Sequence, residues 1–203
     1  MNTNCALDND LAGILVIGGW YNASQSVEFW SAADPEHGSC FLNDYPREMD
    51  YPTVNLISGH LVACFFDTCD IYQEGSWQHL QNTTVDRYLS SSATREDAVL
   101  LIGGYDSNST EWIPVDGSAA QPGPFTVRHG DYHCTIQLSD VLVVTGGGRP
   151  KAEAFVTEYH LEEGTETPLT PMGQPRWGHA CGVYLDADDQ EVSKRLGKKH
   201  IQR

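Results

Sequence analysis

Two histidines and a run of aspartates have spacings that occur in metal sites. His129 and His133 are four residues apart, but in an extended strand four residues span about 13 Å, so the two imidazoles reach one ion only if a loop or bulge intervenes. The run Asp186-Ala187-Asp188-Asp189 matches the start of a calcium loop, yet Glu191 stands where that loop requires glycine. We therefore expect structural or surface histidines, a solvated turn, and neither a metal nor another cofactor.

Sequence motifs of catalysis and nucleotide binding are missing. The chain contains no G-x-S-x-G, no P-loop and no G-x-G-x-x-G, and we expect no enzymatic activity. The first 193 residues carry 7 Lys and Arg against 28 Asp and Glu, whereas residues 194–203 hold five bases and no acid. Because so acidic a body repels phosphate backbones, we expect no nucleic-acid partner. No apolar run approaches the length of a membrane span.

An apolar run followed by two glycines recurs along the chain and indicates a repeated β-strand. Apolar runs end in the glycine doublets Gly18-Gly19, Gly103-Gly104 and Gly146-Gly147. The interval of 85 residues between the first two is about twice the next interval of 43, which predicts a degenerate copy near residue 61. Leu61–Phe65 supplies the apolar run, with Cys64-Phe65 in place of the doublet. Glycine ends a buried strand where the backbone turns with positive φ or crowds a neighbour, so we expect the doublets to serve the backbone.

Two further signatures recur at the same period. A tetrad with an acid in second place follows each run: Val27-Glu28-Phe29-Trp30, Cys69-Asp70-Ile71-Tyr72, Thr110-Glu111-Trp112-Ile113 and Thr157-Glu158-Tyr159-His160. An arginine precedes each run after the first, and Arg47, Arg87, Arg128 and Arg176 are 40, 41 and 48 residues apart. We hypothesise that these arginines pair with tetrad acids and brace neighbouring units, since removing one partner of a buried pair is strongly destabilising.

Each unit is expected to contain four short strands. In the fourth unit these are Tyr132–Leu138, Val141–Gly146, Ala154–Leu161 and a short strand near Thr167–Thr170, with a tight turn at Ser139-Asp140. No sustained 3.6-residue apolar period occurs. Four-stranded units of this length are typical of β-propeller blades. The predicted fold class is therefore all-β, a propeller segment of four-stranded antiparallel blades that forms an incomplete ring.

The doublets, the aromatics Trp30, Tyr72 and Trp77, and the pairs Pro46-Arg47 and Pro175-Arg176 resemble the kelch-repeat family over about residues 5–190. The resemblance implies blades at about 5–45, 46–85, 86–127 and 128–175, a partial fifth blade at 176–190, and a basic tail at 191–203 that we expect to be disordered. Kelch-like propellers usually close with six or seven blades. Since open sheet edges invite pairing, we expect self-association, a fragment of a longer chain, or completion by a partner.

The resemblance also implies a non-catalytic scaffold that binds a protein partner. Ligands would meet the loops after the doublets and between blades, where Trp20, Tyr21, Tyr105, Asp106, Arg149 and Lys151 lie. Exposed aromatic residues and arginine are favoured at binding hot spots. The alternatives are an extracellular adhesion or carbohydrate-binding module, and a fragment of a propeller enzyme similar to galactose oxidase, which would hold copper through tyrosine and histidine.

Cysteines and sequons bear on the compartment. Cys5, Cys134 and Cys181 share one repeat position, where we expect small buried hydrophobes. Cys69 could bridge to Cys64 across a hairpin or to Cys40. Sequons begin at Asn22, Asn82 and Asn108 and favour secretion, whereas residues 1–5 lack the basic and apolar regions of a signal peptide. Either the start is internal to a longer secreted chain, or the protein is cytoplasmic.

Overall fold

The computed structural model describes residues 13–18, 25–31, 39–128, 130–148 and 150–183. Within these ranges the chain forms fifteen strands and no helix, so no described helix could cross a membrane. Several predicted features lie outside the described residues. They are Trp20, Tyr21, Arg149, the sequon residue Asn22, Gly19, His129, the run 186–189 and the basic tail 191–203.

The strands form four antiparallel sheets that follow the chain order. The first sheet holds β1 (Gly13–Ile17), β2 (Val27–Ser31) and β3 (Ser39–Phe41). The second holds β4 (Thr53–Ile57), β5 (His60–Phe65), β6 (Thr68–Gln73) and β7 (Ser76–Asn82). The third holds β8 (Ser91–Arg95), β9 (Ala98–Ile102), β10 (Ser109–Pro114) and β11 (Gln121–Thr126). The fourth holds β12 (Cys134–Leu138), β13 (Val141–Thr145), β14 (Val156–His160) and β15 (Thr165–Pro168).

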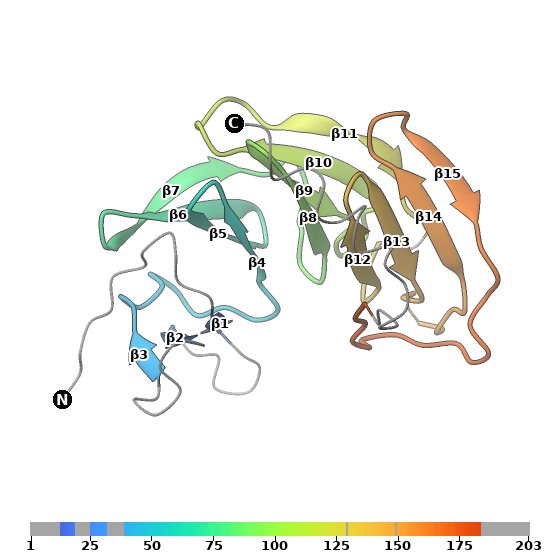
Figure 1. The fold of residues 1–203 in the computed structure, drawn as a ribbon, viewed down its shortest axis with the longest axis horizontal. Coiled ribbons are helices and arrows are strands. Elements are labelled where there is room, and N and C mark those ends of the chain that lie inside the picture. Colours follow the sequence, from blue (N-terminus) through green and yellow to red (C-terminus); the bar gives the residue numbers. More distant parts are fainter. Residues whose placement is uncertain (1–12, 19–24, 32–38, 129, 149, 184–203) are drawn as a thin grey trace, which may run out of the picture.

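The sheets are arranged around an open arc, as Figure 1 shows. The first strands of the second, third and fourth sheets lie side by side, because β8 contacts both β4 and β12. Each of these sheets then runs outward through four consecutive strands. None of the described sheets closes into a barrel. The predicted fold class is confirmed: the protein is all-β, with blade-like four-stranded antiparallel sheets in an incomplete, propeller-like array.

Apolar side chains between neighbouring sheets form the core. Strand β9 is buried along its whole length, and successive side chains of a strand point to opposite faces. Val99 and Leu101 accordingly pack with residues of the second sheet, while Leu100 and Ile102 pack with residues of the fourth. Each large apolar side chain buried in this way contributes roughly 1.5–3 kcal/mol. The third sheet is therefore held from both sides.

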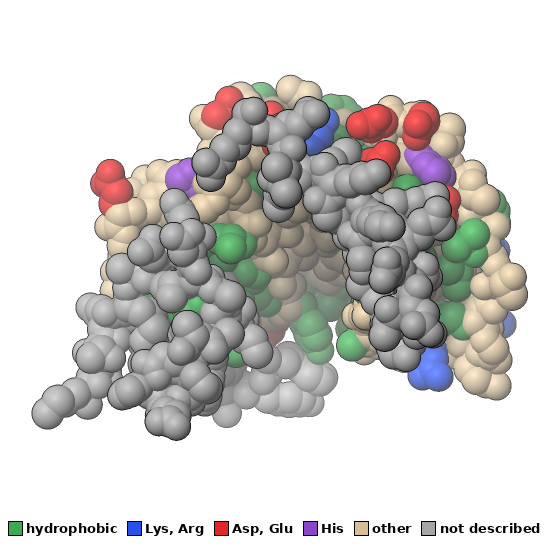
Figure 2. Space-filling model, viewed as in Figure 1, with side chains coloured by type: hydrophobic (Ala, Val, Ile, Leu, Met, Phe, Trp, Pro, Cys, Tyr) green, Lys and Arg blue, Asp and Glu red, His purple; other side chains and the backbone are tan. Residues whose placement is uncertain are grey.

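The loops lie at two opposite ends of the strands. We call one end the turn rim; it holds the turns within the sheets at 58–59, 74–75, 96–97, 115–120, 139–140 and 161–164. We call the other end the connection rim; in the described residues it holds the connections between sheets at 42–52, 83–90, 127–128 and 130–133, the segment 169–178 that follows β15, and the loops 66–67, 103–108, 146–148 and 150–155. Acidic side chains gather along the turn rim, the upper edge of Figure 2.

The strand register corrects one repeat position in the second sheet. Two-residue turns join β4 to β5, β8 to β9 and β12 to β13, and they align Cys64 with Ile102 and Thr145. Phe65-Phe66, rather than Cys64-Phe65, therefore stands where the other sheets carry the glycine doublet. The apolar run of the second sheet is one residue longer than a letter match indicates.

The register also corrects the acidic tetrad of the fourth sheet. Glu111 pairs with Leu101 and Asp70 with Ala63, and the equivalent partner, Val144, pairs with Thr157. Thr157, rather than Glu158, therefore occupies the acidic position of this sheet. Glu158 lies on the opposite face of β14, where its carboxylate is 2.9 Å from His160 Nε2.

Two disulfides tie described segments together. Cys64 and Cys69 face each other across the β5–β6 hairpin, with their Cα atoms 4.1 Å apart, so Cys40 is not the partner of Cys69. Cys134 is bonded to Cys181, with a Cα separation of 6.0 Å. The expectation that these two cysteines are unbonded hydrophobes was wrong. The chain after β15 returns to the start of β12, where the Gly178 amide donates to the Tyr132 carbonyl at 2.9 Å.

Candidate interaction surface

The glycine doublets shape the connection rim. Gly103 has φ +66°, and a Cβ at this position would lie 2.1 Å from the Gly130 carbonyl oxygen. Gly146 has φ +61°, and its Cβ would lie 2.5 Å from the Arg176 carbonyl oxygen. Only a residue without a side chain combines this backbone conformation with so close an approach. The doublets thus allow the strand end to pack against the segment that follows its own sheet.

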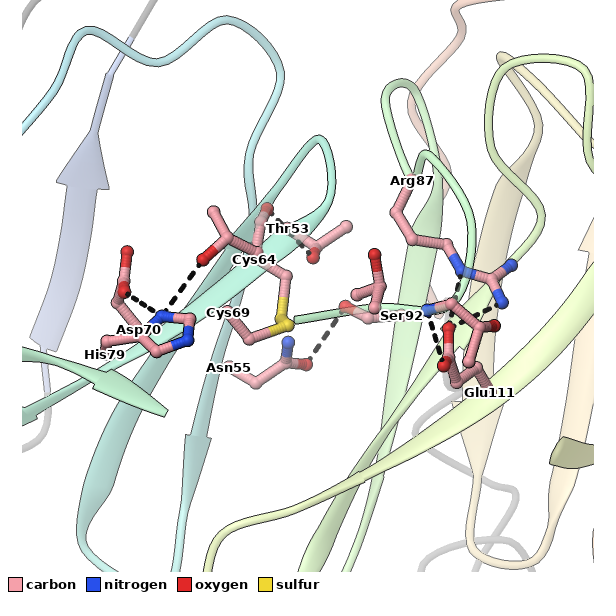
Figure 3. Close-up of a disulfide and its surroundings, with 12 residues drawn as sticks. Thr53, Asn55, Cys64, Cys69, Asp70, His79, Arg87, Ser92 and Glu111 are labelled. Carbon is pink, nitrogen blue, oxygen red and sulfur yellow. Dashed lines mark hydrogen bonds and ion pairs between the residues drawn. A yellow bond between two sulfur atoms is a disulfide. The ribbon is translucent and has the colours of Figure 1, made fainter. Parts of the chain in front are cut away.

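Arg87 braces the third sheet from its preceding connection. Its guanidinium donates to the Glu111 carboxylate from Nη2 at 2.9 Å and from Nε at 3.2 Å, and it also donates to the Gly103 carbonyl at 2.8 Å. The Arg87 and Glu111 side chains are only 1% and 2% exposed. One arginine therefore satisfies a buried acid and the backbone of a doublet glycine (Figure 3).

Arg47 makes the corresponding pair in the second sheet. Its Nη2 lies 2.9 Å from the Asp70 carboxylate, which also accepts a hydrogen bond from the Tyr45 hydroxyl. Burial raises the pKa of Tyr45, and the hydrogen bond to Asp70 raises this pKa further. Figure 3 shows Asp70 and Glu111 on either side of the Cys64–Cys69 disulfide, with Asp70 beside the His79 ring and Glu111 facing the Arg87 guanidinium.

Arg128 and Arg176 are different. Both are exposed, and among the described residues neither has a carboxylate within ion-pair distance. Thr157 stands where the fourth sheet would need an acid for Arg128. The arginine positions therefore comprise two bracing pairs and two exposed arginines that pair with no carboxylate of the described residues.

Five aromatic residues form a continuous group on the connection rim, which we call the aromatic patch: Tyr51, Phe66, Tyr88, Tyr132 and Trp177. The rings of Phe66 and Tyr88 stack with centroids 5.0 Å apart, and Tyr51 lies edge-on to Tyr88 at 6.0 Å. Tyr51 also meets Tyr132 at 6.3 Å, and Tyr132 meets Trp177 at 5.4 Å. Three successive inter-sheet connections, the loop between β5 and β6 and the segment after β15 thus bring their aromatic side chains together.

The aromatic patch is accessible to a partner. Phe66, Tyr51 and Trp177 are 41%, 39% and 48% exposed. Exposed large hydrophobic residues concentrate on this rim in the described part of the chain. Tyr51, Phe66, Val85, Tyr105, Leu169 and Trp177 lie there, whereas Val16, Leu56 and Val183 do not. A contiguous group of exposed apolar side chains of this kind is typical of an interaction surface.

Backbone conformation fixes the orientation of three patch residues. Tyr51, Phe66 and Tyr132 have φ values of 52°, 52° and 55°. Bulky residues are rare in this left-handed region, which costs on the order of 1–3 kcal/mol, and such residues cluster at functional sites. The backbone of these residues and the contacts between their rings are therefore in place before a ligand arrives, which lowers the entropic cost of binding.

Three of the interaction residues predicted from the sequence lie on the same rim as the aromatic patch. Tyr105 and Asp106 lie exposed in the loop after β9, and Lys151 lies exposed in the loop after β13. All three are on the connection rim, and the ring contacts of the aromatic patch do not include Tyr105. The sequon residues Asn82 and Asn108 are exposed.

The sequence analysis missed all five residues of the aromatic patch. A signal for four of them exists: an aromatic residue directly follows Arg87 and Arg176, and another stands two residues before β4 and before β12. Tracking aromatics relative to the arginines would have assigned one to each connection.

A buried histidine, His133, and a half-buried one, His179, lie close to the same rim. The pKa of His133 is lowered to about 4 by burial and by the neighbouring charge of His179. The His133 Nε2 lies 2.7 Å from the Ser91 hydroxyl, and the His179 Nε2 lies 2.8 Å from the Thr145 hydroxyl. In the described part of the chain, no three His, Cys, Asp or Glu side chains gather as a metal-binding group.

Comparison of the chain with protein-family models and with curated proteins gives no match.

Proposed function

We propose that this chain is a non-catalytic scaffold of kelch-type repeats and that its aromatic patch binds a protein partner. The observation that carries the proposal is the unbroken series of ring contacts from Phe66 to Trp177 across successive connections. The positive-φ glycines and the arginine–acid pairs support the kelch-type reading of the sheets.

A protein partner suits the chemistry of this surface. Tyrosine and tryptophan dominate the energies of protein interfaces because they bury large, rigid rings at a small entropic cost. Exposed Arg128, Lys151 and Arg176 lie on the same rim, so the partner would complement apolar rings with acidic groups at the edge of the contact. The turn rim carries acids in most of its turns and lacks a comparable aromatic group in the described residues.

An extracellular adhesion or carbohydrate-binding module is the second candidate. The bridges Cys64–Cys69 and Cys134–Cys181 favour it, because disulfides persist in oxidising compartments. The exposed sequon residues Asn82 and Asn108 agree with an extracellular location. Both candidates use the aromatic patch, and they differ in the ligand.

Site-specific photo-crosslinking tests the proposal. A photoreactive residue is placed at Phe66 or Trp177 in the aromatic patch, and at Ser118 on the turn rim as the matched control. We expect protein adducts from the two patch positions and none from Ser118. Equal labelling from both rims would contradict a protein-binding patch. Binding of glycans without protein adducts would favour the second candidate.

A further inference from the structure

A pocket of about 330 Å³ opens between the third and fourth sheets. It lies where the connection that follows β11 passes β14 and the end of β15. Its lining combines hydroxyl groups, two opposite charges and apolar walls: Thr126, Val127, Arg128, Phe155, Val156, Thr157, Tyr159, Glu166, Pro168, Leu169 and Pro171. This volume is at the small end of ligand sites, so the pocket suits a small molecule or one side chain.

In the second and third sheets, the equivalent position is filled by the protein itself. Asp70 and Glu111 lie there with carboxylates bound by Arg47 and Arg87. Thr157 is the equivalent residue in the fourth sheet, and its shorter side chain brings no charge. Arg128 precedes the first residue of its sheet by six positions, the same distance that separates Arg47 from Thr53. The fourth sheet thus carries an arginine at the Arg47 position but no acid at the Asp70 position.

We propose that this pocket binds a carboxylate from a ligand, which takes the place of the missing acid beside Arg128. The Arg128 guanidinium would pair with the carboxylate through charge-assisted hydrogen bonds. Thr157 and Tyr159 lie on the same face of β14, where the Tyr159 hydroxyl hydrogen-bonds the Thr157 side chain and the Arg128 backbone and thus ties the polar wall of the pocket to the arginine. Phe155, Pro168 and Leu169 would contact the carbon skeleton of the ligand. The carboxylate belongs either to a small organic acid or to a glutamate side chain of a polypeptide.

Glu166 limits which carboxylates bind well. It pairs with Tyr159 across β14 and β15 and lines the same pocket. Its negative charge opposes a simple anion, so ligands that also carry a hydroxyl or ammonium group beside the carboxylate are favoured. Replacing Glu166 with glutamine should tighten the binding of a plain dicarboxylate. This site is separate from the aromatic patch and does not depend on the proposed scaffold function.

Titrations of the full chain with glutarate and with N-acetyl-glutamyl amide, followed by NMR, test the site. We expect saturable shifts at Thr126, Thr157 and Leu169 amides with either probe. R128Q should weaken binding by about tenfold or more, the loss of one strong charge-assisted contact. K151Q, which removes an exposed base outside the pocket, should leave the affinity unchanged, as should W177A. Response to glutarate alone would assign a free acid, and response to the glutamyl probe would assign a side chain.

Restoring the acid provides a second, independent measurement. T157D should pair internally with Arg128, abolish probe binding and raise the melting temperature, and this rise should vanish when R128Q is also present. The proposal is overturned if neither probe saturates, or if R128Q and K151Q reduce binding equally. An equal effect of T157D on stability with and without Arg128 would also overturn it.

Discussion

The Arg87 guanidinium donates two hydrogen bonds to the Glu111 carboxylate, and both side chains are almost completely buried between sheets. The same arginine holds the backbone carbonyls of Gly103 and Ser109 at 2.8 and 2.7 Å. A connection, a strand end and a neighbouring strand are therefore fixed by one side chain. Arg128, in the connection that leads to the next sheet, is exposed.

Arg87→Ala should lower the free energy of unfolding by about 3–5 kcal/mol, because it leaves a buried carboxylate without a partner. Arg128→Ala should change it by less than about 0.5 kcal/mol, as expected for an exposed residue. Urea denaturation of the two variants measures the difference. Equal losses would show that the buried pair has no bracing role.

Gly103→Val should be among the most damaging substitutions in the chain. The valine side chain would have to adopt a positive φ, which costs about 1–3 kcal/mol by itself, and would also meet the Gly130 carbonyl oxygen. Phe66→Gly is the contrasting change. It places a glycine at a residue with φ 52°, at the position where the third and fourth sheets carry the second glycine of the doublet. Its effect on unfolding should stay below about 1 kcal/mol, since strain relief offsets lost ring contacts. If Phe66→Gly destabilised as much as Gly103→Val, the repeat register would be wrong.

Stability should fall as the pH drops from about 6.5 toward 4. His133 has its pKa lowered to about 4 in the folded chain, so the unfolded chain, with an ordinary histidine pKa near 6.5, binds the proton first. The stabilisation is fully present above pH 6.5 and is lost as the pH falls through the folded value, on the order of 3 kcal/mol in total. His133→Gln should flatten the profile between pH 6.5 and 5, above the range where most carboxylates titrate. An unchanged slope in this variant would contradict a neutral, buried His133.

The two disulfides should differ in their contribution to stability. Cys134–Cys181 closes a sequence separation of 47, and Cys64–Cys69 one of 5. Restriction of the unfolded chain gives about 4 kcal/mol for the longer loop and about 2 kcal/mol for the shorter one. Denaturation midpoints of the two double-serine variants measure this order. The reverse order would show that packing around Cys64 and Cys69 outweighs loop closure.

The sequence predicts the regular parts of this fold well. Apolar runs bounded by turn residues specify the second strand of each four-stranded sheet, β5, β9 and β13, and Ser139-Asp140 marks a turn that the structure contains. Matching similar residues along the sequence assigned the wrong repeat position where only the strand register shows which residues are equivalent. Thr110-Glu111 and Thr157-Glu158 are alike as dipeptides, yet only hairpin pairing shows that Thr157, not Glu158, takes the place of Glu111.

The aromatic patch could not be predicted from local patterns. Tyr51, Tyr88, Tyr132 and Trp177 are widely separated along the chain and come together because every inter-sheet connection lies at the same end of the strands. The Cys134–Cys181 bond was missed for a related reason. It depends on the return of the segment after β15 to the inner strand of its own sheet.

Affinity for the partner identified by photo-crosslinking tests the binding role of the aromatic patch most directly. Trp177→Ala should raise the dissociation constant by about tenfold or more, which is the loss of affinity expected for a tryptophan at a hot spot. Leu56→Ala is the matched control, because Leu56 is 67% exposed and lies beside the turn rim. If the aromatic patch is the binding surface, Leu56→Ala should change the dissociation constant by less than about twofold. An unchanged affinity in Trp177→Ala, or equal losses in both variants, would contradict it.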